Sequence, residues 1–96
     1  MKVELQKFGT TLISRQSGRE AFAAFLPTLR EIPSDESVEV DFNGVLTFSP
    51  SWGDEFLRPL QEKFGQHLIL LKSKNLSVTM TIELLEKIGG EKFTIK

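Results

Sequence analysis

The sequence of 96 residues contains no cysteine and no tyrosine, and it contains one histidine, His67. The absence of cysteine excludes disulfide bonds, thiolate metal sites and a cysteine nucleophile, and it is typical of a reducing compartment. No apolar run approaches the roughly 20 residues that span a bilayer. The N-terminal residues do not lead into an apolar signal segment. We therefore expect a cytoplasmic protein without membrane association.

Neither sign of charge is in excess, since 12 Lys and Arg residues stand against 13 Asp and Glu residues, for a formal net charge of −1. Such a balance gives no overall attraction to nucleic acid. The lysines of the last quarter alternate with acidic residues, and we interpret them as solubilising. The composition is ordinary for a globular chain, and the length fits a single domain over residues 1–96.

The apolar pattern of the first third predicts two short strands and a helix. Residues 1–13 contain two strand-like segments on either side of a glycine turn, which predicts a β-hairpin. Ser14 or Ser17 is a suitable N-cap for the helix that follows. Pro27 lacks the N–H that an interior helical turn needs, so we expect a kink or an end near Leu26.

The rest of the chain alternates strands with helices. Residues 37–42 alternate between apolar and charged side chains, which predicts a strand with one buried and one wetter face. A second helix leads to Gly65, residues 67–71 form a buried strand, and a third helix ends at Gly89-Gly90. A last strand closes the chain. The order ββαβαβαβ predicts an α/β fold, in which a mixed sheet carries helices mainly on one face.

The start of the second helix carries the most informative polar residues. Ser51 with Asp54 three residues later has the spacing of a capping box, so we expect Ser51 to be the N-cap and Asp54 its reciprocal partner. Asp54 and Glu55 also suit the positive end of the helix dipole. Trp52 is either a core residue or an exposed anchor of an interface, where tryptophan is enriched.

Arg15 and Arg19 lie one turn apart on the first helix. They sit near its start, which is the unfavourable end of the dipole for a cation. They are therefore candidates for binding a phosphate or an acidic partner.

Three segments of the chain carry a family resemblance. They are Thr11-Leu12-Ile13-Ser14-Arg15 before the first helix, Val40-Asp41-Phe42-Asn43-Gly44-Val45 on a strand, and Trp52 followed by Asp54-Glu55-Phe56. From about Phe8 to Ile88 the sequence resembles a STAS-like domain family of unknown function. This family is related to the tails of sulphate transporters and to bacterial anti-sigma-factor antagonists.

The resemblance implies a fold and a signalling context. Anti-sigma-factor antagonists carry a loop Asp-Ser-Ser-Gly, in which one serine is phosphorylated, and Ser51 falls at that serine. The other three positions of the loop are Ser49, Pro50 and Trp52 here, which departs from the family pattern. The resemblance also implies an ATPase of the histidine-kinase type as a partner.

The sequence thus favours a non-enzymatic regulatory module that binds protein, with no cofactor and with self-association as an open possibility. The expected contacts are Ser49, Ser51, Trp52, Asp54, Arg15 and Arg19. The alternative is a small enzyme or metal-binding protein that uses Asp41, Asp54, Glu55 and His67. With one histidine and no cysteine, the chain has few of the side chains that usually bind transition metals, which weakens this alternative.

Overall fold

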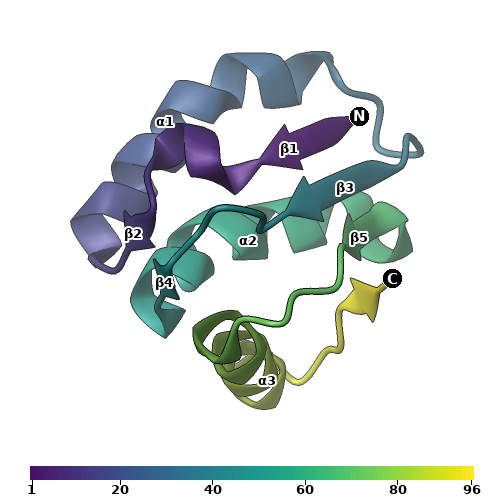
Figure 1. Cartoon of the computed structure of the whole chain (residues 1–96). Coiled ribbons are helices and arrows are strands. Elements are labelled where there is room, and N and C mark those ends of the chain that lie inside the picture. Colours follow the sequence, from purple (N-terminus) through teal and green to yellow (C-terminus); the bar gives the residue numbers. More distant parts are fainter.

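The computed structural model describes residues 1–96 and contains three α-helices and six short strands (Figure 1). Two 3₁₀ turns, η1 and η2, interrupt the connections. The elements in chain order are β1 (Lys2–Glu4), η1 (Leu5–Phe8), β2 (Thr11–Leu12), α1 (Arg15–Glu31), β3 (Val38–Asp41), β4 (Thr47–Phe48), α2 (Pro50–Phe64), η2 (Gly65–His67), β5 (Leu68–Leu70), α3 (Leu76–Gly89) and β6 (Thr94–Ile95).

The main sheet has the order β1-β3-β5-β6, and all its strand pairs are parallel. A second, two-stranded sheet pairs β2 with β4, also in parallel. The α/β fold class is therefore confirmed, but the sheet is parallel throughout and not mixed. The predicted hairpin over residues 1–13 is wrong, because β1 and β2 each pair with a strand from beyond α1. The strand β4 is an addition to the predicted order.

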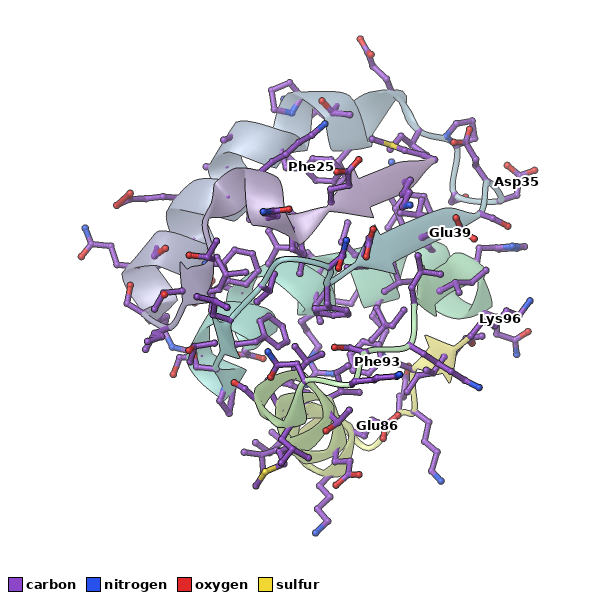
Figure 2. All side chains as sticks on the ribbon, in the orientation of Figure 1. Phe25, Asp35, Glu39, Glu86, Phe93 and Lys96 are labelled. Carbon is purple, nitrogen blue, oxygen red and sulfur yellow. The ribbon has the colours of Figure 1, made fainter.

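The helices leave one face of the sheet open. In β3, Val38 and Val40 are fully buried, whereas Glu39 is exposed and lies on the open face (Figure 2). The crossovers advance across the sheet in one direction, and right-handed crossovers then place successive helices on the same side. Figure 1 shows α1 and α2 behind the sheet, with α3 at the end near β6.

Helix α1 does not end at Leu26 but continues through Pro27 to Glu31. Its buried residues Gly18, Ala21, Phe25 and Leu29 form one face on both sides of the proline. Pro27 lies on the exposed face, so the carbonyl that it leaves without a helical donor opens to water. Packing of the opposite face thus preserves the helix.

Helix α2 occupies the centre of the molecule between α1 and α3. Trp52 is fully buried, with ring centroids 5.0 Å from Phe56 and 5.9 Å from Phe48. Gly18 allows the close approach of α1, because a Cβ at this position would lie 2.8 Å from the carbonyl oxygen of Trp52. The same core of 23 residues draws on all three helices and both sheets. The first turn of α2 is therefore anchored to the core through Trp52.

Candidate functional site

The α2 corner, which we define as Ser49, Pro50, Ser51 and Asp54 with Arg15 of α1, is the region where sequence and resemblance place function. The parallel pairing of β2 with β4 sets the starts of α1 and α2 side by side. The hydroxyl of Ser49 donates to the carbonyl of Ile13, which immediately precedes the Ser14 cap of α1. The two helix starts are therefore tied together.

Ser49, not Ser51, is the N-cap of α2. Its Oγ accepts a hydrogen bond from the backbone N–H of Trp52 at 3.2 Å, and its carbonyl accepts from Gly53. Pro50 occupies the first helical position, where its missing N–H costs nothing. The capping box predicted from Ser51 and Asp54 is wrong, because the favourable position of Pro50 moves the helix start two residues earlier.

Ser51 lies in the first turn of α2 and is partly exposed. It lines a small cleft of about 140 Å³ together with Arg15, Asp54 and Ile88. In this first turn, Pro50 has no N–H, and the N–H groups of Trp52 and Gly53 are already bonded to Ser49. An anion on Ser51 would therefore meet few free backbone donors and would depend on Arg15.

Arg15 pairs with acidic residues of its own chain. Its Nη1 donates to Asp54 Oδ2 at 2.9 Å and to Glu55 Oε1 at 3.0 Å. These hydrogen bonds to Asp54 and then Glu55 raise the pKa of Arg15, so the guanidinium stays charged. Its side chain is nevertheless about half exposed. Arg15 therefore has acidic partners within its own chain, and the binding of an external phosphate or acidic partner stays a prediction.

Two further arginines complete this network. Arg19 lies 3.6 Å from Glu55, and Arg58 lies 3.6 Å from Asp54. Three guanidinium groups thus surround two carboxylates, which leaves one surplus positive charge at the α2 corner. The repulsion that Asp54 and Glu55 would exert on a phosphate is therefore compensated locally.

Trp52 is not a surface contact. Its ring is fully buried and its Nε1 donates to Ser17 Oγ at 3.3 Å. The sequence predicted that Trp52 is either a core residue or an exposed anchor of an interface. The core prediction is confirmed, and the exposed anchor is excluded. The indole holds α1 and α2 together beneath the corner.

A second feature was missed by sequence reasoning. We call it the α3 stripe: Leu76, Met80, Leu84 and Ile88, with exposed fractions of 74%, 66%, 41% and 69%. The residues recur every fourth position, so they form one row along the helix. The buried face of α3 is a different set, Val78, Thr81, Ile82 and Leu85. Apolar residues in two rows of one helix were the available sequence signal, because one packing face cannot cover both.

The α3 stripe and the α2 corner form one continuous surface. Met80 and Leu84 line a shallow hollow of about 420 Å³ with Pro50. Ile88 lines the small cleft with Ser51 and Arg15. Exposed Leu46 extends the apolar surface near the start of α3, because Asn75, the N-cap of α3, donates to its carbonyl at 2.9 Å.

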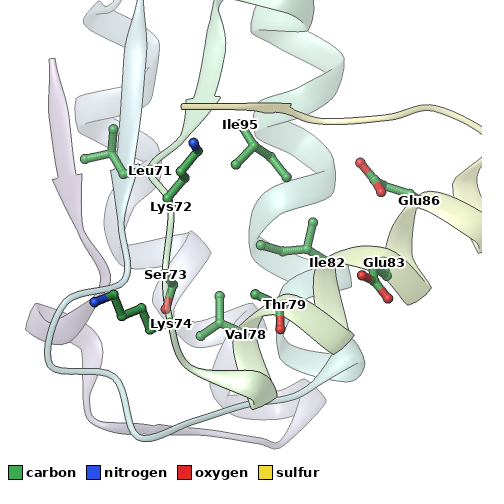
Figure 3. A pocket seen from close by; sticks show the side chains of 10 residues that line it. All are labelled: Leu71, Lys72, Ser73, Lys74, Val78, Thr79, Ile82, Glu83, Glu86 and Ile95. Atoms are coloured by element: carbon green, nitrogen blue, oxygen red, sulfur yellow. The ribbon is translucent and has the colours of Figure 1, made fainter.

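A groove of about 500 Å³ lies on the other flank of α3 (Figure 3). Leu71, Val78, Ile82 and Ile95 provide its apolar lining, with Lys72 and Lys74 on the strand side and Glu83 and Glu86 on the helix side. Glu86 accepts a hydrogen bond from the backbone N–H of Phe93 at 2.9 Å.

The residues of the enzyme or metal alternative lie in separate places. Asp41 is 3.4 Å from Lys2 and accepts from the N–H of Asn43, whereas Asp54 and Glu55 bind arginines. His67 is exposed and follows the opposite end of α2. No three His, Cys, Asp or Glu side chains converge in a way that could hold a metal ion.

No helix has the length and apolar character to cross a bilayer.

Comparison with known proteins agrees with the architecture. The family model described as a STAS-like domain of unknown function matches residues 17–80, about two thirds of the chain. Searches of curated proteins and of solved structures gave no match. The matched range includes most of α1, the α2 residues of the α2 corner and the start of α3, but not Arg15. The chain therefore belongs to the family of STAS-like domains of unknown function.

Proposed function

We propose that this protein is a non-enzymatic, regulatory protein-interaction module, which binds through the surface formed by the α2 corner and the α3 stripe. The observation that carries the proposal is the row of four large apolar side chains left in solvent, whose last member, Ile88, shares a cleft with Ser51. Contiguous exposed apolar surface with a polar rim is typical of sites that bind other proteins. Arg15 and Ser51 supply such a polar rim.

Ser51 is the candidate phospho-acceptor of this surface. A phosphate there would lie in the cleft that Arg15 shares with Asp54, and it would compete with the Asp54 carboxylate for the guanidinium. Phosphorylation would thus loosen the link between α1 and α2 and add negative charge to the binding surface. Both effects would weaken a complex formed through the α2 corner.

The partner that we propose is an ATPase of the histidine-kinase type, in the bacterial cytoplasm. The support is the resemblance to anti-sigma-factor antagonists, together with the position of Ser51 in a cleft that the exposed Ile88 also lines. The alternative of a small enzyme or metal-binding protein has less support, because Asp41, the Asp54–Glu55 pair and His67 are engaged or exposed at separate places.

We expect such an ATPase to be encoded beside this chain, and the test mixes it, once purified, with the full chain and ATP. We expect a stable complex, and intact-mass analysis should show one added phosphate that is absent from Ser51→Ala. Ser51→Asp should weaken the complex, whereas Ser34→Asp in the exposed loop before β3 should not. The proposal would be contradicted if the wild type formed no complex with the ATPase and gained no phosphate.

A further inference from the structure

The α3 stripe is a surface without a cover in the isolated chain. Leu76, Met80 and Ile88 are each about two thirds exposed or more, although the same helix buries Val78, Ile82 and Leu85 well. Figure 1 shows α3 at the edge of the molecule, where no other element reaches beyond it. A partner helix would remove this row from water, and hydrophobic burial favours that association.

We propose that the occupant of the α3 stripe is a second copy of this chain, with the two α3 helices antiparallel and centred on Leu84. A two-fold interface requires a surface that is complementary to itself. Met80 and Ile88 lie four residues before and after Leu84, which is about 6 Å along the helix in each direction. The two-fold axis therefore sets Leu84 against its own copy and Met80 against Ile88 of the second copy.

The charges beside the stripe have the same self-complementarity. Glu83 and Lys87 belong to the neighbouring row of α3, and neither forms an ion pair within the chain. In an antiparallel pair, the same flank of each helix meets its counterpart. With Leu84 at the centre and a rise of about 1.5 Å per residue, Glu83 lies about 3 Å along the axis from Lys87 of the second copy, and the reverse pair forms as well. The two Glu83 side chains are offset from each other by the same distance, so two attractive pairs outweigh one repulsive pair.

This pattern distinguishes a second copy from an unrelated partner. One acid and one base on the rim give no net charge to attract a strongly charged surface, but they match each other across a two-fold axis. Antiparallel helix dipoles add a small favourable contribution. A single pair of short helices is a small interface, so we expect a weak and reversible dimer.

The inference rests on the proposed function in one respect, which is that this surface binds protein. It adds a regulatory consequence. Ile88 lines the cleft of Ser51 and Arg15, so a second copy on the stripe would cover that cleft. Dimer formation and access of a kinase to Ser51 would then exclude each other.

Sedimentation velocity over a range of protein concentrations tests the dimer through charge reversal. We expect a reversible dimer for the wild type. Glu83→Lys and Lys87→Glu should each raise the dimer dissociation constant roughly tenfold, because two attractive pairs become repulsive. The double reversal should restore dimerisation, and so should an equimolar mixture of the two single variants. Single variants that dimerise as well as the wild type would overturn the arrangement.

Leu84→Glu provides a test of the apolar centre and should abolish the dimer over the same concentration range. Ile95→Glu is the matched control, since Ile95 is also exposed but lines the groove on the other flank of α3. Circular dichroism should show both variants folded. A wild type that stays monomeric overturns the inference, although ATPase binding could still support the proposed function. A dimer that binds no ATPase would support the inference about the α3 stripe and contradict the proposed ATPase partner.

Discussion

Helices α2 and α3 are similar in length and are both rich in apolar residues, yet they have different neighbours. Helix α2 lies between α1 and α3, and Trp52, Phe56, Leu57 and Leu60 are all fully buried. Helix α3 packs against α2 and β4 on one side and meets solvent on the other. Apolar residues of α2 therefore stabilise the fold, whereas the exposed row of α3 is free to stabilise a complex.

The residues that stabilise the fold are therefore different from those that are free to bind a partner. A substitution in the buried part of α2 changes the free energy of unfolding, and any effect on a partner follows from that. A substitution in the α3 stripe should leave the free energy of unfolding of the monomer almost unchanged. Four experiments can break or sharpen this comparison, from the largest expected effect to the smallest.

Trp52→Ala should lower the free energy of unfolding by about 3–5 kcal/mol, because it removes a large buried ring and leaves a cavity. Urea denaturation followed by circular dichroism measures the change. Trp52→Phe is the milder control, since it retains a ring that can stack on Phe56, and it should cost clearly less. A small effect of the alanine variant would show that the indole is not a central core residue.

Ile82→Ala and Ile88→Ala form a matched pair on α3. Ile82 is 5% exposed, and its truncation should lower the free energy of unfolding by about 2–4 kcal/mol. Ile88 is 69% exposed, and its truncation should change that free energy by no more than about 0.5 kcal/mol. Both are compared by urea denaturation at low protein concentration, where a weak dimer dissociates. Equal losses would mean that the stripe belongs to the core of the monomer.

Gly18→Ala should destabilise the protein by about 1–3 kcal/mol through overpacking. Alanine has the higher helix propensity by about 1 kcal/mol, so propensity alone predicts the opposite sign. The close approach of α1 to α2 decides the outcome, because the added Cβ would meet the backbone of Trp52, which cannot rotate away. Thermal unfolding reports the sign directly, and a rise in melting temperature would refute this account of the helix crossing.

Ser49→Ala and Ser51→Ala compare the two serines at the start of α2. The first removes the N-cap and should cost about 1 kcal/mol, whereas the second removes no capping bond and should cost less than about 0.5 kcal/mol. Chemical denaturation of both variants under identical conditions provides the measurement. The reverse order would restore Ser51 as the cap. The small cost also makes Ser51→Ala a suitable control in phosphorylation experiments.

Local signals in the sequence predicted several parts of the fold correctly. Of the two serines predicted as caps of α1, Ser14 is the one observed, and Gly65 and Gly90 end α2 and α3 with positive φ angles. The alternation of residues 37–42 also predicted the buried and open faces of β3. Each of these features depends on a few neighbouring residues and on local hydrogen bonds or side-chain alternation. Such features can therefore be predicted from the sequence alone.

The errors concern choices between local alternatives. The sequence prediction took Ser51 as the cap of α2. The structure uses Ser49, whose hydroxyl also donates to the carbonyl of Ile13 beside the pairing of β2 with β4. Pro27 indicated a break in α1, but packing of the opposite helix face outweighs the loss of one hydrogen bond. The outcome at Pro27 cannot be read from the residues next to it, whereas Pro50 at the first helical position is a local signal for Ser49 as the cap.

By itself, the sequence determined that this chain forms an α/β domain of the STAS-like family, that it contains three helices, where α2 and α3 end, and which residues suit a core. Only the tertiary structure decided that β1 and β2 pair in parallel with distant strands, that Arg15 binds Asp54 and Glu55, and that the row from Leu76 to Ile88 stays in solvent. The reason is that helix caps and periodicity depend on neighbours in the chain. Strand partners, ion pairs and the covering of a helix face depend on residues dozens of positions away.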